Sequence, residues 1–193
     1  MSAALVFKPL TAARWDDLVD LFGPERGACA GCWCMWPRMR GVEFQAMPKV
    51  ARRDAFHRLV ESGPPPGLLA YEGRTAVGWV AVSPRRDVAR FNISRVTAPT
   101  DPAGADLAAT WALTCFYARA SHRKRGLMRA LAEAAIAYAR KQGARRIEVC
   151  PIEPARALMW GEAFVGIPSA LLPLGFVEIA RRSPRRPLLR LDL

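Results

Sequence analysis

The feature that most constrains this chain is an apolar strand followed by a basic turn and an amphipathic helix. The run Trp111 to Ala118 is predicted to form a buried strand. The turn Arg123-Lys124-Arg125-Gly126 comes shortly after it, and apolar residues then recur on one stripe of a helix from Leu127 to about Gln142. A helix start exposes unpaired backbone N–H groups, so this order predicts an α/β unit that binds an anion there.

The residues of this turn indicate which anion it binds. Gly126 has no Cβ, which lets the backbone approach a ligand closely, and arginine holds phosphate in a two-pronged contact. Cations at a helix start oppose the helix dipole by roughly 0.3–1 kcal/mol each, so a crowd of them favours a bound anion over a merely solvated surface. The turn is neither a Walker loop nor a dinucleotide-binding Gly-x-Gly-x-x-Gly. The expected ligand is a different di- or polyphosphate. The basic residues of the segment are Arg119, Arg123, Lys124, Arg125 and Arg129.

The other predicted elements are strands and helices over the whole chain. A strand from Leu5 to Lys8 leads into a helix with Thr11 as its N-cap, and the segment 23–47 is irregular. The remaining elements, in order, are a helix from Pro48 to Ser62, a hairpin of Leu68–Tyr71 and Ala76–Val82, a short strand Arg90–Val96, a strand Arg145–Cys150, a short helix Ser169–Leu172, and strands Phe176–Arg182 and Pro187–Leu191. This order predicts an α/β domain with a mixed sheet.

Length and composition favour one domain over residues 1–193. A content of 51% hydrophobic residues is enough for a sizeable core. No apolar run reaches the roughly 18 residues of a membrane span, and the first residues do not read as a secretory signal, so the protein is expected in the cytoplasm. Five cysteines without such a signal favour free thiols or a metal site over disulfides.

The net charge of +12 suits nucleic acid, an anionic membrane or a polyanionic small molecule as partner. The sequence contains no helix-turn-helix, zinc-finger or RNA-binding signature, and its aromatic residues are not interleaved with basic ones. A basic nucleic-acid-binding domain therefore remains only an alternative, and no membrane partner is expected.

With these motifs identified, the chain resembles the GNAT superfamily of N-acetyltransferases. Residues 123–128 resemble its Gln/Arg-x-x-Gly-x-Gly/Ala motif, and Gly78 lies in the expected strand. Ile147-Glu148-Val149 and Leu174-Gly175-Phe176 resemble two further family segments. The resemblance spans Leu5 to Leu193. It implies an α/β (α+β) fold, with a mixed, mostly antiparallel central sheet flanked by helices.

The resemblance also implies a function, which is direct transfer of an acetyl group from acetyl-CoA to an amine acceptor. Backbone groups of Phe116, Tyr117 and Ala118 would pair with the pantetheine arm and stabilise the oxyanion. Met128 stands where the family has a small residue. The residues expected to hold the CoA pyrophosphate are Arg123, Lys124, Arg125, Gly126, Leu127, Met128 and Arg129.

The catalytic groups depart from the family pattern. The family's frequent tyrosine is replaced by Leu171, and the strand Trp111–Ala118 contains no carboxylate. Glu148 is the leading candidate for the base because a carboxylate in an apolar strand often has a perturbed pKa, although an edge position would leave it facing solvent. Tyr117 is the candidate acid, and Cys115, Cys150 and Ser169 are further candidates.

The segment after the first helix concentrates cysteine and tryptophan. Cys29, Cys32 and Cys34 offer three thiols, but structural zinc takes four ligands, so no metal is expected. In the family this region lines the acceptor pocket, which implies that Trp36 and Arg38, with Trp33, bind the acceptor. The alternative is that the tryptophans pack in the core. A small-molecule amine is favoured as acceptor, and a homodimer or a non-catalytic acyl-CoA-binding role remains open.

Overall fold

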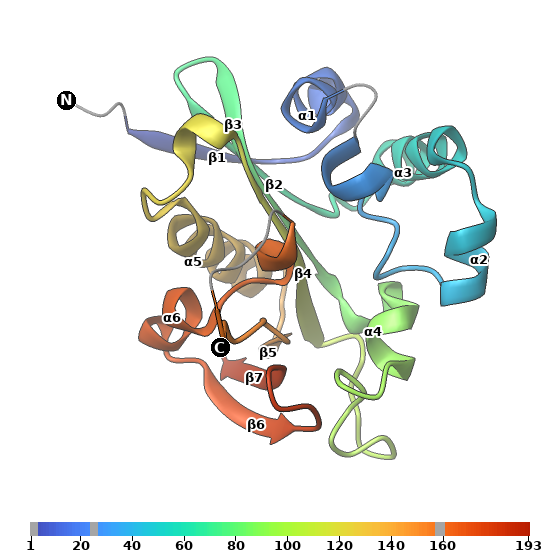
Figure 1. The fold of residues 1–193 in the computed structure, drawn as a ribbon, viewed down its shortest axis with the longest axis vertical. Helices are drawn as coiled ribbons and strands as arrows, with labels where there is room; N and C mark the ends of the chain where they lie inside the picture. The colour runs from blue at the N-terminus through green and yellow to red at the C-terminus, as the bar shows by residue number, and fades with distance from the viewer. Residues whose placement is uncertain (1–3, 24–26, 157–160) are drawn as a thin grey trace.

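The computed structural model describes residues 4–23, 27–156 and 161–193, without the side chain of Cys29. Seven strands form one mixed sheet in the order β1-β2-β3-β4-β5-β7-β6. Every neighbouring pair is antiparallel except β4 and β5, which run parallel. Helices flank both faces of this sheet (Figure 1). The expected fold class is confirmed.

The strands are β1 (Leu5–Pro9), β2 (Gly67–Glu72), β3 (Thr75–Pro84), β4 (Thr110–Ala118), β5 (Arg146–Val149), β6 (Val177–Arg181) and β7 (Pro187–Asp192). The helices are α1 (Trp15–Phe22), α2 (Gly41–Ala46), α3 (Lys49–Ser62), α4 (Ala89–Ile93), α5 (Leu127–Lys141) and α6 (Pro168–Leu171). Short 3-10 helices cover Ala12–Arg14, Arg85–Asp87, Ala120–His122, Glu162–Val165 and Leu172–Leu174, and a single π-helical turn covers Gly27–Gly31. Among the described helices, none has the length and apolar composition needed to cross a bilayer.

The α5 side of the sheet carries the larger core. Leu127, Leu131 and Ala135 belong to the face of α5 that packs on β2, β3 and β4, as their spacing on one helical stripe predicts. A Cβ on Gly78 would lie 3.0 Å from Leu127, so this glycine lets the helix approach β3 closely. The packing holds the start of α5 against the end of β4.

The opposite side of the sheet is covered by α1, α3 and the segment between α1 and α2. Trp15, Phe22 and Phe56 meet Trp79 of β3 in an aromatic core on this face. Figure 1 shows α5 on one side of the sheet and α1 and α3 on the other. The two cores therefore sandwich β3 and β4, the strands with most of the buried residues.

Two sequence predictions are wrong in detail. Thr11 makes no capping hydrogen bond, because a 3-10 turn over Ala12–Arg14 comes before α1 and its hydroxyl accepts a bond from Arg14. The segment Arg90–Val96 is not a strand, since α4 and a turn occupy it. Arg85 explains the helix: its guanidinium binds the Phe91 carbonyl and the Asn92 side chain, so the chain curls around a buried cation.

Candidate functional site

Strand β4 is paired with β5 over only its first half. The parallel pairing joins Thr110–Leu113 to Arg146–Val149 and ends there, while β4 continues to Ala118. The residues Thr114–Ala118, here called the open half of β4, thus keep a neighbouring strand only on the β3 side. An unpaired strand edge presents backbone donors and acceptors to a ligand.

A β-bulge marks the start of the open half. Ala81 pairs with Cys115 while Val82 pairs with Leu113, so Thr114 has no partner on β3. The extra residue reverses the alternation of side chains. Phe116 therefore points into the α5-side core, whereas Cys115 and Tyr117 point to the α1 side.

The basic loop, residues Arg123–Gly126, follows the open half and leads into α5. Lys124 and Gly126 adopt positive φ angles of 58° and 77°, which turn the chain into the helix. Gly126 caps α5 with no side-chain hydrogen bond, and a Cβ there would meet no atom within 4 Å. The amides at the start of α5 are thus open to a ligand, as the sequence predicts for an anion site.

Two arginines hold the basic loop against the sheet. Arg119 donates to the Ala76 carbonyl at 3.0 Å and to Asp20 at 2.5 Å, and Arg123 donates to the Ala118 carbonyl at 3.3 Å. Met128 is half-buried against the α5-side core, so its side chain does not block the loop. The residues expected to hold a cofactor therefore lie on one continuous path, from the open half to the first turn of α5.

The structure gives the two aromatic residues of the open half different surroundings. Phe116 is buried, so only its backbone can meet a ligand at this edge. Tyr117 is half-buried against Phe22, with ring centroids 5.3 Å apart. Within the described residues, the Tyr117 hydroxyl has no hydrogen-bond partner, which leaves its proton available to a ligand.

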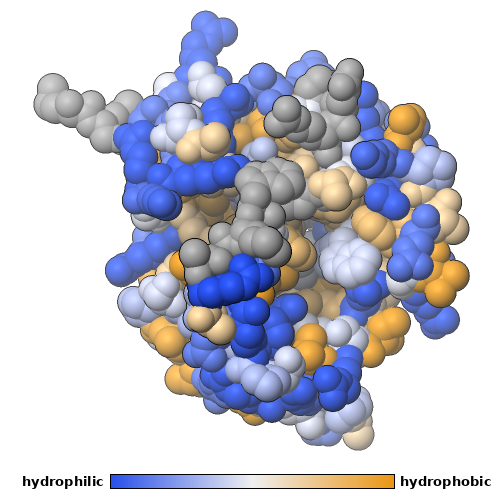
Figure 2. Space-filling view, viewed as in Figure 1, coloured by the Kyte–Doolittle hydropathy of each residue, from blue (hydrophilic) through white to orange (hydrophobic). Residues whose placement is uncertain are grey.

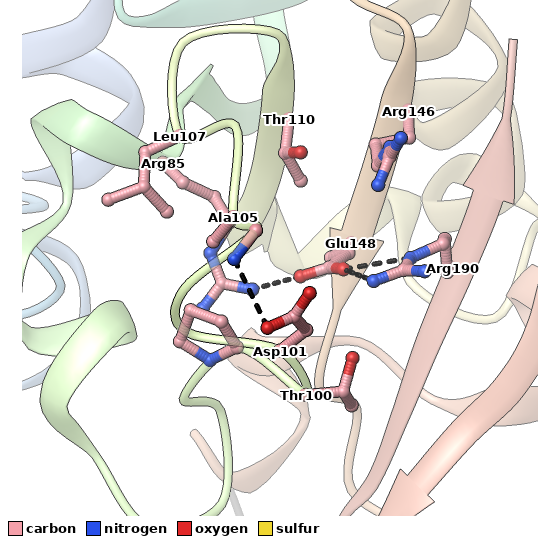
Figure 3. A pocket seen from close by; sticks show the side chains of 11 residues that line it. Arg85, Thr100, Asp101, Ala105, Leu107, Thr110, Arg146, Glu148 and Arg190 are labelled. Atoms are coloured by element: carbon pink, nitrogen blue, oxygen red, sulfur yellow. Dashed lines mark hydrogen bonds and ion pairs between the residues drawn. The ribbon is translucent and has the colours of Figure 1, made fainter.

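Glu148 lies on the α1-side face of β5, among arginines. It is 1% exposed, and its two oxygens accept hydrogen bonds from Arg85 and from Arg190 at 2.7 Å (Figure 3). The cavity beside it has a volume of about 180 Å³ and is lined by the first residues of β4 and β5 and by none of the open half. The arrangement makes Glu148 an anchor for two cations, and its role as base stays a prediction.

The segment Cys34–Arg38, here called the 34–38 wall, crosses the α1-side face of β3 and β4. Trp79 donates its indole N–H to the Cys34 sulfur at 3.1 Å, and Cys34 also hydrogen bonds to Cys115 of the open half. Burial raises the pKa of the Cys34 thiol well above its usual value, so the thiol stays neutral. Arg38 donates to the Ser83 hydroxyl at 2.7 Å at the other end of the wall.

The tryptophans of this region separate into two roles. Trp33 is buried against Trp15 and Phe22, so the alternative of core packing holds for it. Trp36 is half-exposed, with Phe44 against its ring edge at 4.9 Å and the Arg90 guanidinium over its face at 3.5 Å. Figure 2 shows a recess near the centre of this view of the molecule, with apolar residues inside it and hydrophilic residues around it.

The cysteines are the main metal candidates in the sequence. Cys34 and Cys150 are buried free thiols, and the Cys29 side chain lies outside the described residues. The described part of the chain contains no group of three or more His, Cys, Asp or Glu side chains arranged to hold a metal.

Sequence reasoning missed three features of this site. The bulge at Thr114, the contact between Cys34 and Cys115, and the stacking of Arg90 on Trp36 all join residues of different elements. None has a local sequence signal. The nearest hint is the break in apolar alternation within β4, where Leu113 and Phe116 share a face despite a spacing of three.

Comparison with known proteins gives one family and many related folds. A model of the Acetyltransferase (GNAT) family matches residues 16–159. Among curated proteins, none matches the chain.

Three solved structures illustrate the shared fold. The GNAT domain of S. lividans PAT is 19% identical, with a TM-score of 0.55 over 97% of this chain and 89% of that one. The yncA protein from Salmonella typhimurium, solved with acetyl-CoA, is 14% identical, with a TM-score of 0.55 over 98% and 94%. The PaiA N-acetyltransferase of Thermoplasma acidophilum, in complex with coenzyme A, is 11% identical, with a TM-score of 0.53 over 98% and 99%. At such identities the likeness shows the fold alone.

Proposed function

The chain belongs to the acetyltransferase (GNAT) family, and we propose that it transfers the acetyl group of acetyl-CoA directly to an amine on a small molecule. Membership of this family makes the protein an acyltransferase. The observation that carries the proposal is the path from the open half of β4 through the basic loop to the start of α5. Two structural relatives bind CoA or acetyl-CoA in their crystals.

The residues of this path fit a CoA molecule. Uncapped amides at the start of α5 suit a pyrophosphate, and the space beside Gly126 leaves the backbone accessible. Exposed side chains of Arg123, Lys124 and Arg125 supply cations beside those amides. The open half of β4 offers a strand edge of suitable length for the extended pantetheine arm. The pyrophosphate and the pantetheine arm of the cofactor thus each have a chemically matched partner.

Acetyl-CoA supplies an activated acyl group, whose carbonyl oxygen gains negative charge as the amine attacks. Backbone N–H groups of the open half are the proposed donors to that oxygen, because no strand pairs with the open half on the β5 side. The Tyr117 hydroxyl is the proposed proton donor to the departing sulfur. It lies in the open half and has no competing partner in the described structure.

Transfer also requires that the amine acceptor lose a proton. An ordinary alkylamine has a pKa near ~10.4, so a base or a water chain is needed near neutral pH. Glu148 is the sequence-based candidate, but both its oxygens are engaged by arginines. The geometry supports an anchoring role better. A base role would require one guanidinium to release the carboxylate.

The proposed acceptor side is the 34–38 wall, which lies against the open half on the face opposite α5. Trp36 and Arg38 are its proposed acceptor-binding residues, because both remain partly accessible while Trp33 does not. A wall of this kind over one face of the sheet suits a small molecule better than a folded protein.

The proposal is tested by incubating the protein with acetyl-CoA and a panel of small amines and following the release of free CoA thiol. Acetylated product should form only when protein, acetyl-CoA and an accepted amine are present. Thiol release without an amine would indicate hydrolysis. Tight acetyl-CoA binding with no product across the panel would instead support the non-catalytic acyl-CoA-binding role.

A further inference from the structure

Two arginines, Arg38 in the 34–38 wall and Arg90 beside it, are positively charged. Within the described residues, neither forms a salt bridge with a carboxylate. Arg38 bonds only neutral oxygens, those of the Ser83 hydroxyl and the Asp87 carbonyl, and its Nε–H is buried without a partner. Burial lowers the pKa of Arg38, although the nearby Asp87 carboxylate opposes that shift. A partly buried cation without a paired counter-charge is costly unless a ligand supplies one.

Arg90 is the second of these arginines, and packing fixes its position. Its guanidinium lies 3.5 Å over the Trp36 ring, and its other neighbour is Gly41, where a Cβ would come within 2.9 Å of a guanidinium nitrogen. Trp36 itself packs against Phe44. The Arg52 guanidinium lies over the Phe44 ring, 3.8 Å from its centroid. The cation is thus placed in advance by a chain of packed rings and guanidinium groups, which lowers the entropy cost of binding.

The donors of Arg90 remain available to a ligand. Within the described residues, its side chain makes no hydrogen bond and no ion pair, although it carries five N–H donors. A guanidinium over the face of a ring can still donate from its N–H groups, which match the two oxygens of a planar carboxylate.

Arg90 also lines an open pocket of about 530 Å³ between α2 and α4, two helices that lie side by side in Figure 1. The charged residues of the lining are Arg40, Arg90 and Glu43, two positive and one negative, which leaves one positive charge in excess. Glu43 already accepts the Arg40 backbone N–H at 3.1 Å. Val42 and Ile93, 80% and 60% exposed, give the pocket apolar sides. An anion with an attached carbon chain fits this lining.

The pocket is linked to the proposed transfer site by the wall itself. The Arg90 amide donates to the Pro37 carbonyl at 3.1 Å, and Cys34 contacts Cys115 in the open half. Two residues of chain, from Cys34 to Trp36, span at most about 7 Å. The wall thus brings the Arg90 pocket and the open half of β4 to neighbouring parts of the same face.

We propose that Arg90, supported by Trp36 and Gly41 and assisted by Arg38, binds a carboxylate of the acceptor, so that the acceptor is an amine that also carries a carboxylate. This inference rests on the proposed function, since it names the acceptor class of that site. Arg90 orients the acceptor and takes no part in proton transfer.

The experiment compares pairs of amines that differ only in the carboxylate, such as an amino acid and its decarboxylated amine. Wild type should use the carboxylate member with a kcat/KM roughly 10- to 100-fold higher, the size expected for one charge-assisted pair. Arg90→Gln should raise KM for the amine that carries the carboxylate. KM for the amine without it and KM for acetyl-CoA should stay unchanged. Arg90→Lys keeps the positive charge but loses the two-pronged contact, so its KM for the amine with the carboxylate should lie between those of wild type and Arg90→Gln.

The matched control is Arg86→Gln. Arg86 lies near Arg90 in sequence, but its side chain is 64% exposed and lines neither pocket. It should behave as wild type. Equal use of both members by wild type, an equal loss for both in Arg90→Gln, or preference only for phosphorylated amines would overturn the proposal.

Direct binding separates this proposal from the proposed function. Amino acids are titrated into CoA-saturated wild type and Arg90→Gln protein, with folding of both checked by thermal melting. Saturable binding that Arg90→Gln weakens would support the carboxylate site even if no amine is acetylated. Acetylation of neutral amines without any amino-acid binding would refute the carboxylate site and leave the proposed function intact.

Discussion

Arg85, just after β3, donates a hydrogen bond to Glu148 of β5, and each residue is only 1% exposed. The pair joins the loop that carries α4 to β5, the strand that pairs with the first half of β4. Arg190 of β7 donates to the other oxygen of Glu148. A buried carboxylate held in this way stabilises the arrangement of three strands, and its loss would leave Arg85 buried and unpaired.

Glu148→Gln should therefore lower the free energy of unfolding by about 3–5 kcal/mol, because it breaks a buried ion pair. Urea denaturation measures this change. The control is Glu178→Gln on β6, which removes an exposed ion pair with Arg181 and should cost at most about 1 kcal/mol.

The same variant tests Glu148 as the base. If Glu148 removes the amine proton, turnover per folded molecule should fall near neutral pH and recover at high pH, where more of the amine is already neutral. If activity instead falls only in proportion to the fraction of folded protein at every pH, the role of Glu148 is structural alone.

Gly126→Asp should abolish acetyl-CoA binding, because it places a carboxylate where the pyrophosphate would approach. Saturation at about 100 times Kd stabilises a protein by about 2.7 kcal/mol, so acetyl-CoA should raise the wild-type melting midpoint by about 5–10 °C and that of the variant not at all.

Gly143→Asp is the matched control for this experiment. Gly143 lies just beyond the other end of α5, with a φ of 85° and no atom within 4 Å of the position that a Cβ would take. Its backbone strain is similar, so it should keep the full acetyl-CoA shift. Loss of the shift in both variants would mean that strain, rather than the anion site, explains the effect.

Trp36→Ala should raise KM for the acceptor while acetyl-CoA binding stays nearly unchanged, because the ring supports Arg90 and lies away from the basic loop. Trp36→Phe keeps an aromatic face and should retain part of the affinity. Steady-state kinetics with each substrate varied in turn measures both. A parallel loss of acetyl-CoA affinity would show that the wall is needed for the whole fold.

The buried Cys34 thiol predicts a specific alkaline instability. Its pKa is raised by burial, so above the ordinary thiol pKa of ~8.5 the unfolded chain loses a proton that the folded chain keeps. This stabilisation is complete below that pH and is lost as pH rises. Free energy of unfolding should fall more steeply above about pH 8.5 in wild type than in Cys34→Ala, by up to about 1.4 kcal/mol per pH unit. An equal dependence of the free energy of unfolding on pH in the two proteins would contradict a raised pKa for Cys34.

Metal analysis of protein purified without added zinc should give well below one metal ion per chain, and a chelator should not change the melting midpoint. Three thiols are one short of a structural zinc site. A tight content of one metal per chain would overturn this prediction and would make Cys29, Cys32 and Cys34 the first residues to substitute.

The elements predicted from the sequence differ in how well the structure confirms them. The strand Trp111–Ala118, the helix from Leu127 and the hairpin at Glu72–Thr75 lie where periodicity and turn residues place them. In each case the residues that define the element also bury its core face. The prediction of a strand at Arg90–Val96 is wrong because the conformation there follows from Arg85, a buried residue of a neighbouring turn, and from no periodicity of its own.

The sequence by itself determined the family, the fold class and the basic loop, because these follow from patterns within short stretches of chain. Only the tertiary structure decided which side chains meet. It brought Arg90 onto Trp36, Cys34 onto Cys115, and two arginines onto Glu148. Such contacts depend on how separate elements pack, and a guanidinium or a carboxylate acquires its role from the charges that packing places around it.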